Sequence, residues 1–472
     1  MTTETIMWIA KLILDIINIF FVVYLVGYST FLFLSVTVGS SELFKKKRQY
    51  RMMNAIENNY YIPISIIVPA YNEEVTVASN VRSLLALDYK VYEIIVVDDG
   101  SSDNTSKVMI EEFKMLAVRM PIHRQLQCQQ EEFVYETKIN NVRLTLIRKK
   151  NGGKADALNM GINASRFPYF ICIDADSVLQ YDSLKKIALP LLENEDVVAV
   201  GGSVRPSNGT TIENGRVVSY KLPKKLLPSM QALEYDRSFL ASRILLDKFN
   251  GALIISGAFG LFQKKLVIDA GGYDPNTMGE DMELVVKIHE YCAANDIPYH
   301  IKYATDAICW SQVPEKLRDL MKQRKRWHIG LFQSLWMHRH LAVNPKYGAV
   351  SFISYTYYLL YELLSPYIEV FGALSVILAI VLDMLNLRFA LLFMAIYAAF
   401  GAIMSLTSFF ARTQTLDLKL SFLDVMKAIG LCFFEVTILR TILAYSRFFA
   451  LFRYHKKKRN WGKIERKKID YR

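Results

Sequence analysis

Hydrophobic and polar residues follow three different patterns along the chain, and the first is a long apolar run near the N-terminus. Residues 16–38 contain no ionisable side chain except tyrosine. As a helix that rises about 1.5 Å per residue, this run reaches roughly 34 Å, which is enough to cross a bilayer. Basic residues follow it directly from Lys45 and are typical of the cytoplasmic flank of a span. The pattern predicts an N-terminal membrane anchor.

A second apolar region lies in the last third of the chain and predicts two more spans. Residues 367–385 and 389–410 are joined by three residues and are expected to form a helical hairpin. Upstream, residues 348–366 are rich in aromatic side chains and end in a proline, so we expect them in the membrane interface or as a re-entrant segment. Residues 421–451 are apolar but carry five charges, which favours an in-plane segment or one that lines a protein-walled path.

Between the membrane segments, short β-branched runs alternate with helical patterns. The expected strands are residues 64–68, 93–97, 144–147, 169–173 and 197–200. This alternation predicts a mainly parallel sheet with crossover helices, whose ligands bind at the carboxyl ends of the strands. The polar stretch 107–141 is expected to be a long surface loop. A second polar stretch, 204–237, is a candidate acceptor-binding or lid element.

Composition and charge agree with a membrane protein. Hydrophobic residues make up 52% of the 472-residue chain. The net charge of +12 is concentrated in residues 45–51 and 453–472, each beside an apolar run. Such clusters are typical of cytoplasmic flanks that touch anionic lipid, so the charge does not indicate nucleic-acid binding. The five widely spaced cysteines argue against a disulfide framework or a zinc site among them.

Three of the expected strands end in polar residues of chemical interest. The first leads into residues 71–74, the second into 98–101 and the fourth into 174–176. Because the carboxyl ends of parallel strands meet at one edge of a sheet, these residues are expected to line one crevice. Asp174 and Asp176 lie two positions apart, so both can approach one hard cation that also binds phosphate oxygens. Taken singly, each segment also fits a solvated turn or a helix cap.

A glycine-rich loop, residues 151–154, opens a predicted helix that runs to Asn163. Its glycines allow close backbone approach, the helix N-terminus attracts anions, and Lys154 adds a point charge suited to a diphosphate. By itself, the motif fits a loop with a surface lysine equally well. Farther on, residues 256–260 precede a short stretch with strand character.

Two later motifs carry acidic, basic and aromatic residues. Glu280 and Asp281 start a predicted helix, where they also fit simple compensation of the helix dipole. Gln323, Arg326 and Trp327 lie on one helix face, at positions i, i+3 and i+4. A basic helix beside the membrane with an interfacial tryptophan is the alternative interpretation of this second motif.

In this order, the motifs resemble those of the membrane-embedded family 2 glycosyltransferases, whose inverting members include cellulose, chitin, hyaluronan and poly-N-acetylglucosamine synthases. The matching elements are the Asp-Asp-Gly strand end, the Asp-Ala-Asp pair, Gly-Glu-Asp at 279–281 and Gln-x-x-Arg-Trp at 323–327. The similarity covers about residues 61–341, and residues 151–159 are most similar to the bacterial poly-N-acetylglucosamine synthases. The resemblance implies an α/β GT-A fold, a Rossmann-like domain that binds a nucleotide sugar, inserted between transmembrane helices.

The resemblance also implies roles for individual residues. Asp281, with Glu280 beside it, is similar in position to the general base of the family. A Mg²⁺ or Mn²⁺ ion would be held by Asp176, assisted by Asp174. Residues implied to bind the donor are Tyr71, Glu73, Asp98, Asp99, Lys154, Asp174 and Arg326. Residues implied to bind the acceptor are Gln323, Trp327, Ser256 and Gly257.

The expected function is that of a processive inverting transferase of a hexosyl or N-acetylhexosaminyl group. It would move the sugar from a UDP-sugar to a growing β-linked extracellular or capsular polysaccharide at the cytoplasmic face, coupled to secretion. Two alternatives stay open: a non-processive transferase of one sugar to a lipid acceptor, and a non-catalytic sugar-nucleotide-binding scaffold of a secretion complex. Expected partners are the donor, a polysaccharide or glycolipid acceptor, membrane lipids, and a second copy or a secretion partner.

The expected organisation is a multi-pass protein of the plasma (inner) membrane with its N-terminus outside. Residues 1–44 would form the anchor, 45–345 a cytoplasmic GT-A domain ending in interface helices, 346–455 a C-terminal membrane region and 456–472 a basic cytoplasmic tail. Three expected spans are fewer than in synthases that carry their own polysaccharide channel. This difference argues against secretion by the chain alone.

Overall fold

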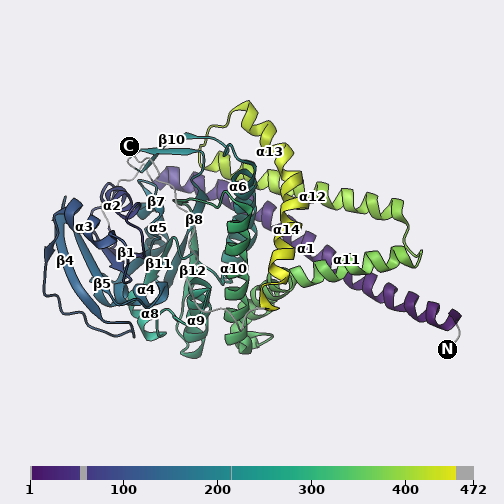
Figure 1. Cartoon of the computed structure of the whole chain (residues 1–472), viewed down its shortest axis with the longest axis horizontal. Coiled ribbons are helices and arrows are strands. Elements are labelled where there is room, and N and C mark those ends of the chain that lie inside the picture. Colours follow the sequence, from purple (N-terminus) through teal and green to yellow (C-terminus); the bar gives the residue numbers. More distant parts are fainter. Residues whose placement is uncertain (1–2, 54–60, 214, 453–472) are drawn as a thin grey trace.

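A computed structural model describes residues 3–53, 61–213 and 215–452, and a ten-stranded sheet forms its centre (Figure 1). The strands are β1 (Ile64–Ala70), β2 (Tyr92–Asp98), β3 (Leu116–Ala117), β4 (Glu131–Ile139), β5 (Val142–Lys149), β6 (Tyr169–Cys172), β7 (Ser177–Leu179), β8 (Val197–Pro206), β9 (Thr210–Glu213), β10 (Arg216–Tyr220), β11 (Gly260–Gln263) and β12 (His300–Ser311). The large sheet has the order β3-β4-β5-β2-β1-β6-β11-β8-β12-β7, and β9 pairs with β10 separately.

All five predicted strands are confirmed, as β1, β2, β5, β6 and β8. β5, β2, β1 and β6 pair in parallel, and β11 lies antiparallel between β6 and β8. Every residue of β1 and β2 is buried, because helices cover both faces of this part of the sheet. Burial on both faces explains why these strands are continuous apolar runs in the sequence.

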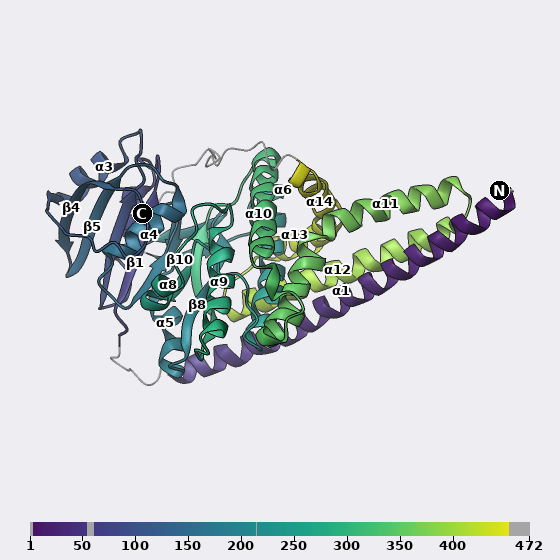
Figure 2. The same ribbon diagram turned by 90° about the horizontal axis from the view of Figure 1, so that it is seen from below.

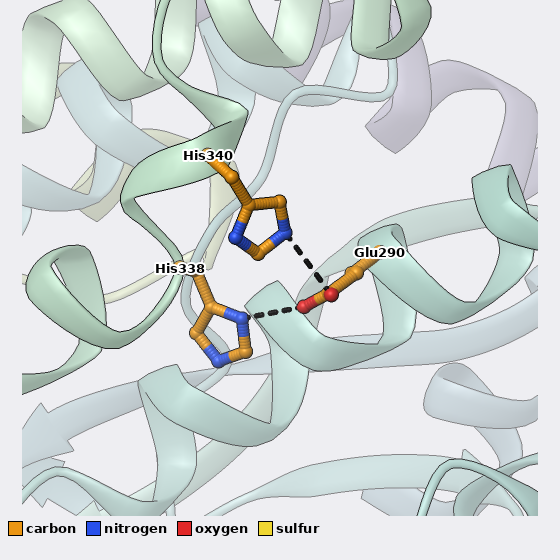
Figure 3. A group of neighbouring side chains, drawn as sticks. All are labelled: Glu290, His338 and His340. Carbon is orange, nitrogen blue, oxygen red and sulfur yellow. Dashed lines mark hydrogen bonds and ion pairs between the residues drawn. The ribbon is translucent and has the colours of Figure 1, made fainter.

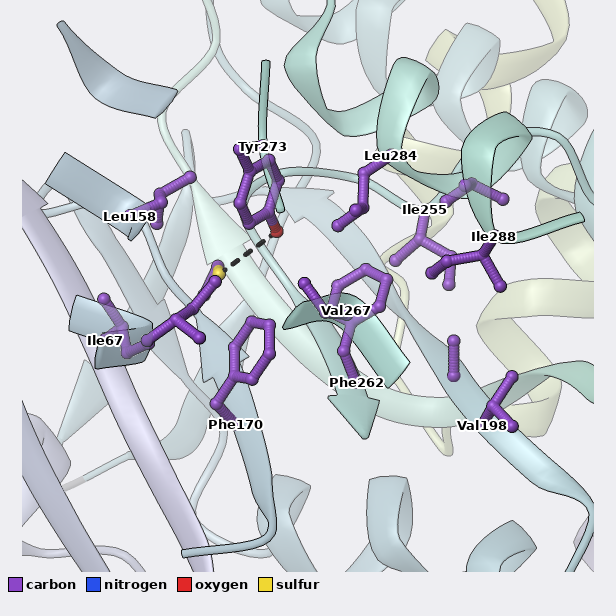
Figure 4. Close-up of a cluster of buried hydrophobic side chains, with 14 of the residues drawn as sticks. Ile67, Leu158, Phe170, Val198, Ile255, Phe262, Val267, Tyr273, Leu284 and Ile288 are labelled. Atoms are coloured by element: carbon purple, nitrogen blue, oxygen red, sulfur yellow. Dashed lines mark hydrogen bonds between the residues drawn. The ribbon is translucent and has the colours of Figure 1, made fainter. Parts of the chain in front are cut away.

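The helices lie on both sides of the sheet. Those of the central body are α2 (Val77–Leu85), α3 (Thr105–Phe113), α4 (Lys154–Ala164), α5 (Ser183–Glu193), α6 (Leu226–Phe239), α7 (Leu245–Asp247), α8 (Lys264–Asp269), α9 (Glu280–Ala294) and α10 (Leu317–Met337), with the short helical segments η1 (Leu240–Ile244), η2 (Arg339–Leu341) and η3 (Pro345–Tyr347). Ile66 and Val68 of β1 pack with α2, α3 and α5, whereas Ile67 packs in the cluster with α4, α8 and α9 (Figure 4). This alternation is the two-residue period of a strand.

The prediction of a surface loop at residues 107–141 is wrong. The segment completes α3 and then adds β3 and β4 to the edge of the sheet, with β4 antiparallel to β5. Asn140 and Asn141 both have positive φ and make the tight turn between the two strands, as a type I′ hairpin turn requires. Several side chains of β4 are exposed, so its polar composition concealed the strand.

The helices expected near the membrane are α1 (Thr3–Met53), η4 (Val350–Tyr355), η5 (Tyr358–Leu363), α11 (Ser365–Val381), α12 (Leu387–Thr415), α13 (Phe422–Phe434), η6 (Glu435–Leu439) and α14 (Arg440–Phe448). α1, α11 and α12 extend away from the sheet, whereas α13 packs against α6 and α14 against α10 (Figures 1 and 2). Trp8–Lys47 and Leu387–Thr415 are long and apolar enough to cross a membrane. Val350–Leu363 with Ser365–Val381, bent by 49°, would make a third span if the pair is one span.

The bend between η5 and α11 falls in the stretch expected to lie in the interface or to re-enter. α11 and α12 occupy the two apolar runs at 367–385 and 389–410. The division into an anchor, a cytoplasmic domain and a C-terminal membrane region stays a prediction. The predicted basic tail at 456–472 lies outside the described residues.

Charged residues of segment 421–451 form ion pairs with other helices of the chain. Glu435 pairs with Arg237 of α6 at 2.6 Å, and Arg440 pairs with Glu369 of α11 at 3.1 Å. A cavity of about 110 Å³ lies between these helices, and Arg324 of α10 also lines it. Charges in an apolar region are costly unless they are paired, and these pairs therefore explain how the segment keeps them.

Candidate active site

The carboxyl ends of β2, β1 and β6 lie side by side, which confirms the predicted meeting of the strand ends. β1 pairs with β2 along its whole length and with β6 over four residues. The N–H of Asp99 continues this pairing by donating to the carbonyl oxygen of Ala70 at 2.9 Å. The segments that follow the strands, including the half-buried Tyr71 and residues 174–176, therefore start at one edge of the sheet.

Asp98 and Glu73 shape two loops at this edge. Asp98 is fully buried, and its carboxylate accepts hydrogen bonds from the N–H of Ser101, at 2.8 Å, and the hydroxyl of Ser106. Glu73 is 6% exposed and accepts a hydrogen bond from the hydroxyl of Thr76 at 2.6 Å. Asp98 thus holds the backbone of its own loop in place, and Glu73 holds the Thr76 side chain. Direct contact of either with a nucleoside stays a prediction.

Asp99 fastens the glycine-rich loop in front of α4. Its carboxylate accepts hydrogen bonds from the N–H groups of Gly152 and Gly153, at 3.0 and 2.7 Å. It also pairs with Lys149, whose side chain is fully buried. Gly153 has a φ of 93°, a conformation that favours glycine. These contacts fix the start of α4 and so the position of Lys154.

Lys154 joins three separate segments. Its Nζ lies 2.7 Å from Asp174 Oδ1 after β6 and 3.4 Å from Glu280 Oε1 at the start of α9. A Cβ added at Gly257 would lie 3.2 Å from this Nζ and 3.4 Å from the Cβ of Asp281. The glycine therefore leaves room for the lysine and the aspartate to approach each other. Five of the predicted site residues meet here.

Asp281 lies in the first turn of α9. Its Oδ2 accepts a hydrogen bond from the N–H of Gly257 at 3.1 Å, and its Oδ1 accepts one from the N–H of Met282 at 2.9 Å. The two N–H groups hold the carboxylate in a fixed orientation at the start of the helix. Ser256, next to Gly257, accepts a weak hydrogen bond from the N–H of Ala258 at 3.4 Å.

Asp174 and Asp176 lie on the turn between β6 and β7. The N–H of Ser177 donates to the carbonyl oxygen of Asp174 at 3.0 Å, and the Asn80 side chain from α2 donates to that of Ser177. Both aspartates are half-buried. The turn thus carries two carboxylates, of which Asp174 contacts Lys154, and this oxygen donor set suits Mg²⁺ or Mn²⁺.

α10 crosses the start of α9 at very short range. A Cβ added at Gly330 would lie 2.7 Å from the Cα of Gly279, so only glycine allows this approach. Gln333, one turn farther along α10, accepts a hydrogen bond from the N–H of Met278 at 2.8 Å. The contact places α10 against the loop that carries Asp281.

The predicted acceptor motif lies on this helix. Gln323 is half-buried, and its Oε1 has no hydrogen-bond partner among the described residues. Arg326 is exposed, and Trp327 is 41% exposed. The guanidinium of Arg324 lies 4.5 Å from the centre of the Trp327 ring and pairs with Glu234. The cation covers one face of an accessible indole.

The charges of the site change the pKa values of two of its residues. Burial alone would lower the pKa of Lys154, but Asp174 and Glu280 outweigh it and raise that pKa. Burial raises the pKa of Glu280, the Asp281 charge adds to this, and Lys154 and Arg326 oppose it. Lys154 therefore keeps its positive charge in the middle of the acidic residues.

Sequence reasoning missed three residues that position the site. These are Lys149, which pairs with Asp99; Gln333, which holds the loop before α9; and Asn159 of α4. Asn159 exchanges two hydrogen bonds of 2.9 Å with the backbone of Tyr273. A lysine at the end of an apolar strand and an asparagine inside an apolar helix were the available signals, because both need buried partners.

The arrangement combines a carboxylate suited to act as a base, a pair of carboxylates suited to a hard cation, and a lysine between them. An accessible tryptophan lies on the adjacent helix. Such a set fits the transfer of a group from an anionic leaving group to a hydroxyl. The acids at the strand ends and the helix starts come from distant parts of the sequence, so the fold alone brings them together.

Comparison with known proteins identifies a family and several relatives. The profile described as "Glycosyltransferase like family 2" matches residues 62–330. A poly-β-1,6-N-acetyl-D-glucosamine synthase of Staphylococcus epidermidis is 31% identical over 321 residues, 66% of this chain and 67% of that protein. The protein of the same name from Staphylococcus aureus strain COL is 32% identical over 268 residues, 57% of this chain and 54% of that protein.

Among solved structures, a mannosyltransferase from Pyrobaculum calidifontis in complex with GDP-mannose and Mn²⁺ has a TM-score of 0.50 and 17% identity. The match covers 82% of this chain and 98% of that one. At this identity the likeness concerns the fold alone. It agrees with the α/β sheet and its helices on both faces.

Proposed function

Because this chain belongs to glycosyltransferase family 2 and has its GT-A fold, we propose that it is an inverting transferase that extends a β-linked polysaccharide from a UDP-sugar. N-acetylglucosamine is the sugar that we propose, since the relatives are named as synthases of its β-1,6-linked polymer. The enzyme would add many sugars before it releases the product. Its donor side would lie at the carboxyl edge of the sheet and its acceptor side along α10.

The observation that carries this proposal is the meeting of Asp174, Lys154, Glu280 and Asp281. Lys154 lies 2.7 Å from Asp174 and 3.4 Å from Glu280, and Asp281 is the next residue of α9. A diphosphate would bind between the lysine and the acidic turn, with its charge offset by Lys154 and Arg326. The base would then face the sugar attached to that diphosphate.

In the proposed reaction, Asp281 accepts the proton of an acceptor hydroxyl as the oxygen attacks the anomeric carbon. A new carbon–oxygen bond forms, and the bond from the anomeric carbon to the diphosphate oxygen breaks with its electron pair. UDP leaves from the opposite side, so the configuration inverts. Both Asp281 oxygens accept backbone hydrogen bonds, which orient the carboxylate and leave lone pairs for the proton.

Asp176 and Asp174 would hold a divalent ion, Mg²⁺ or Mn²⁺. The bound ion would supply charge stabilisation for the departing diphosphate. The Mn²⁺ in the Pyrobaculum calidifontis complex, a protein of similar fold, supports a divalent ion here, and the two half-buried carboxylates on one turn suit it. Tyr71, Glu73 and the 98–101 loop would enclose the nucleoside.

The acceptor would lie against Trp327, with Gln323, Ser256 and Gly257 beside it. An exposed indole provides a flat apolar platform for a sugar ring, as aromatic rings do for planar ligands. We place this reaction at the cytoplasmic face of the plasma membrane. Two helices able to span a bilayer and the basic residues after the first of them support this placement.

Two variants test the division of the site. Asp176→Ala removes a metal ligand, so UDP affinity should weaken and lose its dependence on divalent ions. Asp281→Asn keeps the shape, so it should bind UDP-N-acetylglucosamine normally while transfer falls by roughly 10²- to 10⁴-fold, as for loss of a general base. Calorimetry would measure binding, and coupled UDP release would measure turnover.

Analysis of the reaction product tests the sugar, the linkage and the chain length. Purified protein in nanodiscs would receive a panel of UDP-sugars with Mg²⁺ or Mn²⁺, and the products would be analysed for size and linkage. A long β-linked polymer supports the proposal. A glycolipid with one added sugar would instead identify a non-processive transferase, and unimpaired turnover of Asp281→Asn would contradict the assignment of the base.

A further inference from the structure

We propose a second metal site, formed by Glu290, His338 and His340, which binds Zn²⁺ away from the proposed donor site. Glu290 lies near the C-terminal end of α9, His338 directly follows α10, and His340 lies in η2. Figure 3 shows both imidazole rings directed at the Glu290 carboxylate. The proposal does not depend on the reaction that the chain catalyses.

The three side chains already have the spacing of a metal site. His338 Nδ1 lies 2.7 Å from Glu290 Oε2, and His340 Nε2 lies 3.0 Å from Glu290 Oε1. All three ligand atoms lie within 4.8 Å of one another. Four ligands about 2.0 to 2.1 Å from a tetrahedral zinc ion are about 3.4 Å apart, so small side-chain rotations admit the ion. Water would complete the coordination.

A buried carboxylate orients the first histidine. His338 Nε2 lies 3.4 Å from Oε1 of Glu283, which is fully buried in α9. In the metal-free site Nδ1–H donates to Glu290; once zinc displaces this proton, Nε2–H would donate to Glu283 and the lone pair of Nδ1 would face the ion. Metal-binding histidines usually donate their second ring N–H to a carboxylate in this way. Within the described part of the chain, Glu283 Oε2 has no hydrogen-bond partner.

The neighbouring cations leave the site open. Lys287 pairs with Glu283 at 3.1 Å on the side of α9 and balances its buried charge. Arg339 lies between the two histidines in sequence, but its guanidinium is directed to Trp336, 5.5 Å from the ring centre. Two imidazoles with one carboxylate favour zinc over Mg²⁺ or Ca²⁺, which prefer oxygen ligands.

The site would join α9 to the end of α10. Asp281 lies nine residues before Glu290 on α9, about 14 Å along the helix. The crossing of Gly279 and Gly330 already holds the N-terminal end of α9 against α10. A zinc ion at Glu290 would therefore fix the second end, so the helix with the proposed base and the helix with Trp327 move together.

Zinc titration of the whole protein tests the site. The full chain, carrying no histidine tag, would be stripped with a chelator, held in nanodiscs without nucleotide and titrated with Zn²⁺ by calorimetry. We expect one equivalent to bind, and this binding should disappear in His340→Ala and in Glu290→Gln. His340 is 47% exposed, so its replacement leaves the core intact. X-ray absorption should show imidazole nitrogens at about 2.0 to 2.1 Å.

Two further sets of variants complete the test. Glu283→Gln should weaken Zn²⁺ binding about 10- to 100-fold, as expected for loss of the carboxylate behind a ligand. His123→Ala, an exposed histidine elsewhere, and Asp176→Ala, at the proposed donor metal, should bind Zn²⁺ as the unchanged chain does. Absence of binding, or binding that persists in His340→Ala, would overturn the proposal and leave a hydrogen-bonded cluster. Neither result would contradict the proposed transferase activity, which is measured separately.

Discussion

Among single residues, Lys154 supplies a positive charge in contact with the acidic residues of the site. Asp174 and Glu280 raise its pKa, so its positive charge persists beside three carboxylates. Lys154→Met should weaken UDP binding roughly 10- to 100-fold, because a charged hydrogen bond contributes about 1.5 to 3 kcal/mol. Calorimetry with UDP would measure this change. The exposed neighbour Lys150→Met is the matched control, and equal losses in both variants would refute a specific role for Lys154.

His328 predicts a loss of stability in acid. It is 2% exposed, and neither ring nitrogen has a hydrogen-bond partner in the parts of the chain that are described. Burial, with the charge of Arg447, lowers its pKa to about 3. Below about pH 6.5 the unfolded chain takes up a proton that the folded chain does not, so the free energy of unfolding falls by up to about 1.4 kcal/mol per pH unit.

The measurement is the midpoint of thermal unfolding at about pH 7.5 and about pH 5, above and below the ordinary histidine pKa. His328→Leu removes the titrating ring without breaking a hydrogen bond and should show a smaller drop between the two conditions. An equal drop in both proteins would show that other groups cause the acid sensitivity.

At this scale the sequence located the candidate residues better than it predicted their contacts. Asp174, Lys154 and Asp281 could be chosen because strand ends and helix starts are positions that the pattern predicts. The inward direction of Asp98 was not predictable, since the same Asp-Asp-Gly letters fit a carboxylate that faces a ligand or one that holds its own loop. Lys149 was missed because its partners come from other segments.

At the scale of elements, the crossing of α9 and α10 depends on two glycines. In Gly330→Ala the new Cβ would meet the backbone of Gly279, so α10 must shift outward. We expect transfer to fall about 100-fold, the cost of displacing a reacting group by about 1 Å, while UDP binding is retained. Turnover and calorimetry would be measured together.

Gly430→Ala in α13 is the control for this substitution, since a Cβ there meets nothing within 4 Å. It should leave turnover unchanged and stabilise its helix slightly, because alanine is a better helix former than glycine. If Gly330→Ala turns over as fast as this control, the close crossing is not needed for transfer.

The elements themselves were predictable where their patterns are strong. The five buried strands and the helices that begin at Lys154 and Glu280 follow directly from apolar runs and glycine-rich loops. β4 was missed because a partly exposed strand near the sheet edge, with charged side chains, has the composition of a loop. The turn at Asn140 and Asn141 was the local signal that could have identified it.

For the whole molecule, the proposed orientation predicts which residues reagents can reach. In a background that lacks the five native cysteines, Thr5→Cys should react with a membrane-impermeant maleimide in intact cells. Lys150→Cys, which is exposed at the end of β5, should react only after lysis. The reverse pattern would contradict a catalytic domain in the cytoplasm.

The membrane helices and the sheet are connected by one unbroken element. α1 has 51 residues and is about 76 Å long, and it runs beside α12 before it reaches the sheet (Figure 2). Near its end, Lys46 donates to the carbonyl oxygen of Tyr303 at 2.9 Å, and Lys47 pairs with Asp417. If α1 spans the membrane as proposed, this unbroken helix holds the carboxyl edge of the sheet at a constant distance from the bilayer. If the chain extends a polymer, the polymer must therefore move by one sugar after each addition, while the catalytic domain stays at the same distance from the membrane.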